Sequence, residues 1–201
     1  MKTIYLVRHG EYENPNFILP NRLKGFPLSE KGRSQIIQVA KYLKDKNIDI
    51  IYSSPILRTK QSAQILQTLL QKTLIFSKSI IELASPLQGM NLSIISDVER
   101  YGDTFKFPLH FQKGGETVKH VIKRMKRLLR IILLKQNYSS TVIVSHGDPI
   151  MVCALTETGY NIDARHAIHS YNSFLPYIPK GGIIKMEYEK DTFQTLQRVN
   201  F

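Results

Sequence analysis

Cysteine is almost absent from this chain, whose 201 residues include only Cys153. No disulfide can therefore form within it, and the apolar stretch PIMVCAL around Cys153 predicts a buried thiol without a chemical role. No apolar run is long enough to span a bilayer, and charge enters at Arg8 before any stretch of signal-peptide length. We therefore expect a cytoplasmic protein with no membrane partner.

Acidic residues are scarce beside basic ones, since 16 Asp and Glu stand against 28 Lys and Arg, a formal net charge of +12. Such a charge suits a nucleic acid, an anionic lipid or a phosphorylated small molecule as a partner. Much of the excess lies in residues 116–135, where apolar residues recur at helical spacing and basic residues fall largely on the other side. This pattern predicts a core helix with a solvated basic face. Because no aromatic residues are interleaved with the basic ones, we expect no nucleic-acid binding.

Strand-like and helix-like segments alternate along the chain, with no internal repeat or low-complexity tract. Apolar runs predict strands at residues 2–7, 48–54, 73–76, 141–145 and 181–189. Helical spacing predicts helices at residues 29–46 with Ser29 as N-cap, 55–71, 116–135 and from about 148 onward. This alternation predicts an α/β fold with a mainly parallel central sheet. The length favours one domain over residues 1–201, with a lid-like insertion around 83–114.

Polar residues follow three of these strands at the points where the strands end. The first strand ends in Arg8 and His9, the second leads to Arg58 one helical turn on, and the fourth ends in Ser145 and His146. Because ligands of open α/β sheets bind at the carboxyl ends of the strands, we expect these side chains to share one pocket. A glycine follows each histidine, which lets the chain pass close to a ligand.

Two arginines and two histidines at one sheet edge predict an anion site. Arginine offers a planar fork of donors suited to phosphate, and a neutral imidazole is a competent nucleophile toward phosphorus. A phosphohistidine intermediate follows, surrounded by Arg8, Arg58 and a protonated or donating His146. These groups make a metal unnecessary, and we expect no metal at the pair His166 and His169, which has no cysteine nearby in the sequence.

The motifs LVRHGE, NRLKGFPLSEKG, IIYSSPILRTKQSA, GGET and VIVSHGDPI occur in this order. Together they resemble the histidine phosphatase superfamily, the phosphoglycerate mutase-like proteins, over most of the chain from residue 2 to about 160. The resemblance implies a three-layer α/β/α sandwich and a phosphorylated nucleophile, here His9. By the same resemblance, Arg8, Arg58 and His146 complete the phosphate pocket, and Arg22 matches an arginine that lines the substrate entrance.

A leaving alkoxide needs a proton, which a carboxylic acid beside the pocket could supply. We favour Glu82, because the family places an acidic residue just past the third strand, in a stretch that reads ELASPLQGM here. Asp148, two residues after His146, is the competing donor. The chain departs from the family pattern at Pro86, where a glycine is usual, in the absence of a second glutamate, and at Tyr12, where serine or threonine is common.

The predicted activity is hydrolysis of a phosphomonoester without metal or cofactor, in which His9 takes the phosphoryl group and water removes it. Phosphoglycerate mutase-type transfer is an alternative, although only the tail of the mutase signature LNERHYGGLQG is echoed in this chain. A catalytically silent phosphate-binding module is a further alternative, against which the retained histidines and arginines argue. We expect a phosphorylated small molecule as substrate, while a phosphoprotein substrate and the oligomeric state stay open.

Overall fold

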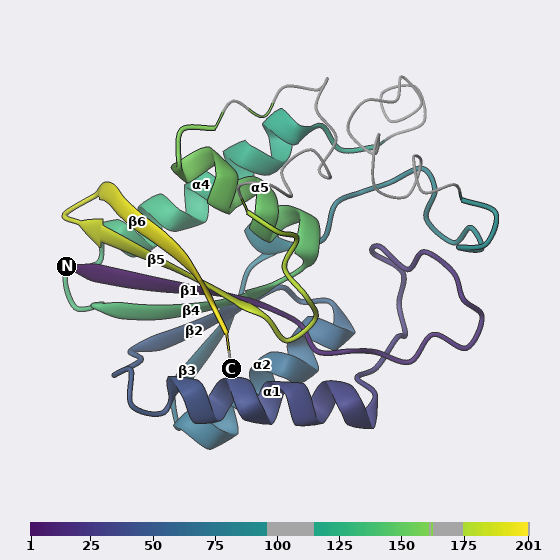
Figure 1. Ribbon diagram of the computed structural model, residues 1–201, viewed down its shortest axis with the longest axis horizontal. Coiled ribbons are helices and arrows are strands. Elements are labelled where there is room, and N and C mark those ends of the chain that lie inside the picture. Colours follow the sequence, from purple (N-terminus) through teal and green to yellow (C-terminus); the bar gives the residue numbers. More distant parts are fainter. Residues whose placement is uncertain (96–114, 161, 163–174, 201) are drawn as a thin grey trace.

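The computed structural model describes residues 1–95, 115–160, 162 and 175–200 (Figure 1). The described part contains, in chain order, β1 (Lys2–Arg8), α1 (Glu30–Leu43), β2 (Ile50–Ser53), α2 (Leu57–Leu70), β3 (Thr73–Phe76), the 3₁₀ turn η1 (Lys78–Ile80), α4 (Val118–Leu134), β4 (Ser140–Ser145), α5 (Gly147–Glu157), β5 (Ile183–Glu189) and β6 (Thr192–Val199). No helix among these residues is long and apolar enough to cross a membrane.

The strands form one six-stranded sheet in the order β3-β2-β4-β1-β5-β6. The first four strands of this order run parallel, while β5 pairs antiparallel with β1 and β6 pairs antiparallel with β5. The predicted mainly parallel sheet is therefore confirmed. The sequence interpretation missed β6, an edge strand that is mostly solvent-exposed and therefore lacks a continuous apolar run.

Helices cover both faces of the sheet (Figure 1), with α1 and α2 on one side and α4 and α5 on the other. The strand β1 contributes side chains to the hydrophobic core on each face of the sheet, because successive side chains of a strand point to opposite faces. Tyr5 and Val7 belong to the core shared with α1 and α2, whereas Ile4 and Leu6 belong to the core shared with α4 and α5. This three-layer α/β/α arrangement confirms the expected fold.

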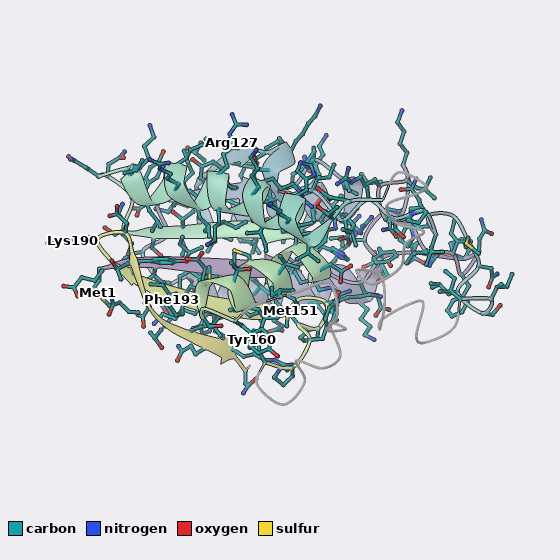
Figure 2. The ribbon with its side chains drawn as sticks, turned by 90° about the horizontal axis from the view of Figure 1, so that it is seen from above. Met1, Arg127, Met151, Tyr160, Lys190 and Phe193 are labelled. Atoms are coloured by element: carbon teal, nitrogen blue, oxygen red, sulfur yellow. The ribbon has the colours of Figure 1, made fainter. Side chains whose placement is uncertain are left out.

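A local sequence signal explains where α1 begins. Ser29 caps α1 as expected, since its side chain accepts a hydrogen bond from the Gly32 N–H at 3.1 Å. The helix α2 starts at Leu57, two residues later than expected. The basic helix α4 buries its apolar stripe and exposes its basic face, as Figure 2 shows for Arg127 on the side away from the sheet.

Candidate active site

Three segments that are far apart in the sequence meet at the carboxyl ends of the parallel strands. Arg8 pairs with Ser145 across β1 and β4, and the His9 N–H donates to the Ser145 carbonyl oxygen at 3.1 Å. His9 therefore lies beside His146, with the two ring centroids 5.3 Å apart. Arg58 reaches the same point from the first turn of α2 and is only 1% exposed. The structure thus brings together the four residues expected around a phosphate.

The loop after β1 depends on a glycine that another backbone segment approaches closely. A Cβ atom on Gly10 would lie 2.3 Å from the Gly32 carbonyl oxygen, so no larger residue fits without moving the start of α1. The Gly10 N–H donates to Ser62 Oγ at 3.2 Å, and the Ser62 hydroxyl donates to the Arg58 carbonyl oxygen. These contacts fix the His9 loop against both α1 and α2.

The imidazole of His9 is buried and held in one tautomer. Its Nδ1 lies 2.8 Å from the Gly10 carbonyl oxygen, which can only accept, so Nδ1 carries the proton. Nε2 keeps its lone pair and accepts a hydrogen bond from Arg58 Nε at 3.2 Å. Burial, and then the charges of Arg58 and Arg8, lower the pKa of His9 well below its usual range. The ring is therefore neutral at pH 7, with Nε2 available as a nucleophile.

Both arginines are anchored at one end and have a buried N–H group left over. Arg58 Nη2 donates to the Asn21 carbonyl oxygen at 2.8 Å, and Arg8 Nη1 donates to the Ile178 carbonyl oxygen at 2.7 Å. Arg58 Nη1 and Arg8 Nε are buried and have no hydrogen-bond partner among the described residues. A buried donor without an acceptor is costly, and phosphate oxygens are acceptors that a guanidinium binds strongly. The arrangement therefore favours an anion beside His9.

His146 occupies the N-terminal end of α5 and is fully buried. Its Nδ1 lies 3.1 Å from Arg58 Nη2, which can only donate, so the proton belongs to Nε2, which lies 2.9 Å from Ser54 Oγ. Burial, followed by the charge of Arg58, lowers the pKa of His146 well below its usual range. A bound phosphate would oppose this effect, because a nearby anion favours the protonated imidazole.

Glu82 places a carboxyl group at the same cluster. Its Oε2 lies 3.5 Å from His146 Nδ1 and 3.6 Å from Arg58 Nη2, while its Oε1 accepts a hydrogen bond from the Leu83 N–H at 2.9 Å. Burial, and then the charge of Asp148, raise the pKa of Glu82 to about 7, although Arg58 acts in the opposite direction. A carboxyl group with this pKa is protonated about half of the time at neutral pH, as a general acid requires.

Asp148, the competing proton donor, is engaged by a tyrosine. The Tyr177 hydroxyl donates a hydrogen bond to Asp148 Oδ1 at 2.7 Å, and the centroid of the Tyr177 ring lies 5.1 Å from Arg8 Cζ. A Cβ atom on Gly147 would lie 2.0 Å from Tyr177 Oη, so a glycine is needed where this ring crosses the start of α5. The geometry gives Asp148 a role in positioning the wall beside Arg8.

Arg22 packs against the segment that carries Glu82. Its Nε donates to the Glu82 carbonyl oxygen at 2.7 Å and its Nη2 donates to Glu116 Oε2 at 2.7 Å. The side chain is 32% exposed, so it lies at the edge of the cluster. These contacts give Arg22 a structural partner on each side, and its contact with substrate stays a prediction.

Glu116 is a residue of this site that the sequence interpretation left without a role, although it belongs to the quoted GGET motif. It is 6% exposed, and its carboxylate accepts hydrogen bonds from Arg22 and from Arg124 Nε and Nη2, the latter two at 2.7 and 3.0 Å. Arg124 Nη1 also donates to the Ser79 carbonyl oxygen at 2.9 Å. Glu116 thus holds two arginines, of which one donates to the Glu82 carbonyl oxygen and the other to the Ser79 carbonyl oxygen, three residues earlier.

Tyr12 and Lys180 form a second group that no sequence pattern predicted. The Tyr12 ring lies 5.4 Å from the His9 ring and 5.3 Å from Arg58 Cζ. Lys180 Nζ lies 4.6 Å from the same ring centroid. These residues add an aromatic wall and a further cation beside the nucleophile.

Two expectations fall partly or wholly outside the described residues. His166 and His169 lie in the range 163–174, and most of the expected lid-like insertion lies in the range 96–114. Within the part of the chain that the structure describes, no group of three His, Cys, Asp or Glu side chains could hold a metal ion.

Comparison with known proteins gives a family match along almost the whole chain. The profile of the histidine phosphatase superfamily (branch 1) matches residues 4–200. Phosphoserine phosphatase 1 of Hydrogenobacter thermophilus is 32% identical over 168 residues, which cover 77% of this chain and 76% of that protein.

Solved structures show the same fold at lower sequence identity. Bacillus stearothermophilus YhfR superposes with a TM-score of 0.80 at 21% identity, covering 96% of this chain and 95% of that one. A mycobacterial glucosyl-3-phosphoglycerate phosphatase superposes with a TM-score of 0.77 at 17% identity, covering 99% and 97% of the two chains. The phosphoglycerate mutase-like sandwich expected from the sequence is therefore confirmed.

Proposed function

Since this chain belongs to the histidine phosphatase superfamily and is a phosphatase, we propose that it hydrolyses small phosphomonoesters through a phosphoryl group carried on His9. The observation that supports this most directly is the tautomer of His9. Its proton is held by the Gly10 carbonyl oxygen, and the Nε2 lone pair lies beside two guanidinium groups that retain unpaired buried N–H donors.

In the first step, His9 Nε2 attacks phosphorus while the bond between phosphorus and the ester oxygen breaks. Arg8 and Arg58 stabilise the negative charge on the transferred phosphoryl group, and His146 adds a donor once it is protonated. The leaving alkoxide takes the proton of Glu82, whose pKa of about 7 suits this transfer. The products are an alcohol, a phosphorylated His9 and a Glu82 carboxylate.

In the second step, water attacks the phosphorus of the phosphohistidine and the bond between phosphorus and Nε2 breaks. The Glu82 carboxylate accepts a proton from this water and so returns to its protonated form. Inorganic phosphate leaves with the remaining charge, and His9 is again neutral. Both half-reactions use the same protein groups, and neither step as written requires a metal or cofactor.

The relatives point to small phosphorylated metabolites as substrates. One relative is a phosphoserine phosphatase and one structural neighbour is a glucosyl-3-phosphoglycerate phosphatase, and both names describe esters of modest size. We propose the same class of substrate for this chain. Transfer of the phosphoryl group to a second metabolite, as in a mutase, would need that metabolite to compete with water for the phosphohistidine.

Phosphate release by the full chain and its His9→Ala variant tests the proposal. Wild-type protein should release inorganic phosphate from O-phospho-L-serine or 3-phosphoglycerate. His9→Ala should reduce the rate to background because, among the described residues, His9 is the one whose imidazole Nε2 faces Arg58. Substantial turnover by His9→Ala would refute the assignment. Isomerisation of 3-phosphoglycerate faster than phosphate release would instead identify a mutase.

A further inference from the structure

Lys180 is a cation beside the active site that the proposed reaction does not use. The Gly181 N–H donates to the carbonyl oxygens of Arg8 and His9, so the chain around Lys180 is fixed directly against the nucleophile. Lys180 Nζ lies 4.6 Å from the centroid of the Tyr12 ring, whose centroid is 5.4 Å from that of the His9 ring. The ammonium group and the nucleophile therefore lie beside the same aromatic ring.

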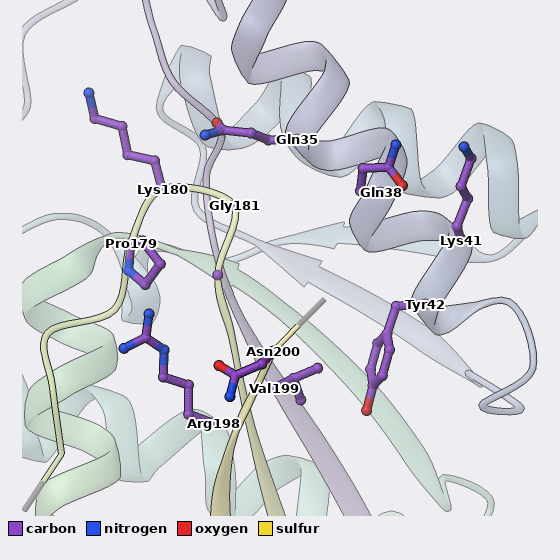
Figure 3. Close-up of a pocket in the computed structure, with 11 residues that line it drawn as sticks. Gln35, Gln38, Lys41, Tyr42, Pro179, Lys180, Gly181, Arg198, Val199 and Asn200 are labelled. Atoms are coloured by element: carbon purple, nitrogen blue, oxygen red, sulfur yellow. The ribbon is translucent and has the colours of Figure 1, made fainter.

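The side chain of Lys180 is directed toward the active site and away from a neighbouring pocket. That pocket, of about 590 Å³, lies between α1, β6 and residues 179–182. Figure 3 shows the Lys180 side chain at its rim, extending away from Lys41, Tyr42 and Arg198. The contact with Tyr12 gives the direction in which it points instead.

The ammonium group of Lys180 shares its carboxylate partner with a second lysine. Among the described residues, the carboxylate within 4.0 Å of it is that of Glu11, whose Oε2 lies 4.0 Å away but only 3.4 Å from Lys31 Nζ. Partial burial lowers the pKa of Lys180; the charge of Glu11, the next largest influence, raises it, and the charges of Arg8, Lys31 and Arg58 lower it. An anionic group of a ligand at this point would therefore be stabilised by Lys180, because Lys180 shares the Glu11 carboxylate with Lys31.

We propose that Lys180, seated on the Tyr12 ring, binds a carboxylate of the substrate while the phosphoryl group of the same molecule lies against His9. This inference rests on the proposed phosphatase function and narrows its substrates to phosphomonoesters that carry a carboxylate. The ammonium group and the His9 ring both lie beside the Tyr12 ring. A substrate that binds both must therefore carry its carboxylate close to its phosphate. Small phosphorylated acids meet this requirement.

Two esters that differ only in the carboxylate test the proposal. O-phospho-L-serine carries it and O-phosphoethanolamine lacks it, while the phosphate, the ester oxygen and the ammonium group are shared. Lys180→Gln should lower kcat/KM for O-phospho-L-serine by about tenfold, since a charge-assisted hydrogen bond of this kind commonly contributes that much. The same variant should leave kcat/KM for O-phosphoethanolamine within about twofold, and Lys180→Arg should restore the preference.

Lys31→Gln is the matched control, because Lys31 pairs with the same Glu11 carboxylate but is 70% exposed. It should leave the ratio of the two kcat/KM values unchanged. Hydrolysis of p-nitrophenyl phosphate by each variant measures the phosphatase reaction without a carboxylate in the substrate.

Three results would overturn the inference. An equal loss for both esters in Lys180→Gln would show a general electrostatic effect on His9, and no loss for either ester would show that Lys180 does not contact substrate. In either case hydrolysis of p-nitrophenyl phosphate by the wild type would leave the proposed function standing. Failure of the wild type to hydrolyse all three compounds would instead refute the proposed function together with this inference.

Discussion

Replacing Glu82 by glutamine removes a titratable proton while keeping the shape of the side chain. The carboxyl oxygen concerned lies 3.5 Å from His146 Nδ1 and 3.6 Å from Arg58 Nη2, so the amide can occupy the same place. A positioned general acid supplies about 10²- to 10⁴-fold in rate. We therefore expect Glu82→Gln to slow hydrolysis of an alkyl phosphate by at least about 10²-fold. An aryl phosphate should lose much less, because a phenolate leaves without help from a proton.

The pH profile of the wild type gives a second signature of the same proton. Burial raises the pKa of Glu82 to about 7, so the acid is protonated below this pH and becomes a carboxylate above it. The kcat/KM for an alkyl phosphate should therefore fall as the pH rises through 7, by about tenfold per pH unit at the limit. This fall in kcat/KM with rising pH should be absent for Glu82→Gln and weak when the substrate is an aryl phosphate.

The assay compares kcat/KM for glycerol 3-phosphate and p-nitrophenyl phosphate in three variants. Arg58→Ala should slow both substrates to a similar degree, because the guanidinium stabilises the phosphoryl group common to them. Asp148→Asn should show no selective loss for the alkyl ester, because the Asp148 carboxylate accepts a hydrogen bond from the Tyr177 hydroxyl and does not supply the proton to the leaving group. Rapid mixing experiments on both esters would show whether formation or hydrolysis of the phosphohistidine limits turnover.

A selective loss in Asp148→Asn, with equal losses in Glu82→Gln, would refute the reasoning and assign the acid to Asp148. If neither variant discriminates and no burst of alcohol release precedes steady turnover, formation of the phosphohistidine limits the rate and the acid has no role in that step. Water would then supply the proton.

Three further outcomes follow from the structure. Activity should survive EDTA, because Arg8 and Arg58 supply the charge that a metal would bring, and loss restored by one metal would contradict this. Glu116→Gln should reduce the free energy of unfolding by about 3 kcal/mol, as Arg124 would lose its buried carboxylate; chemical denaturation measures this, with the exposed Glu30→Gln as a control that should change nothing. The pKa of Glu82 is about 7 in the folded state and 4.5 in the unfolded chain, so the folded state binds this proton more tightly. The stability that this proton contributes is therefore complete below pH 4.5 and is lost as the pH rises through 7. Thermal unfolding should therefore show wild type losing stability relative to Glu82→Gln between pH 5 and pH 8.

The central part of the fold could be predicted because its signals are local and repeated. Apolar runs marked β1, β2 and β4, each of which is buried, and helical spacing marked the helices that cover them. The strand β6 could not be found in the same way. Its exposed residues carry no apolar run, and its pairing with β5 is fixed by the hairpin that joins them.

The cluster around His9 could be predicted because parallel strands deliver their ends to one edge of a sheet. Arg8, His9 and His146 meet there through the register of β1 and β4, and Arg58 reaches them from the first turn of α2. The contacts of Glu116 and Lys180 depend on loops of irregular course, where no periodicity links a residue to its partner. Arg22 and Glu116, for example, are 94 residues apart in the sequence and join at 2.7 Å.

Trapping the phosphorylated enzyme tests the central claim most directly. Wild-type protein mixed with a radiolabelled phosphomonoester and quenched in base during turnover should carry phosphate that is stable to base and labile to acid. Peptide mapping should place that phosphate on Nε2 of His9, and the label should disappear when excess unlabelled substrate is added. Rapid turnover without any protein-bound phosphate, or a label on another residue, would contradict the account.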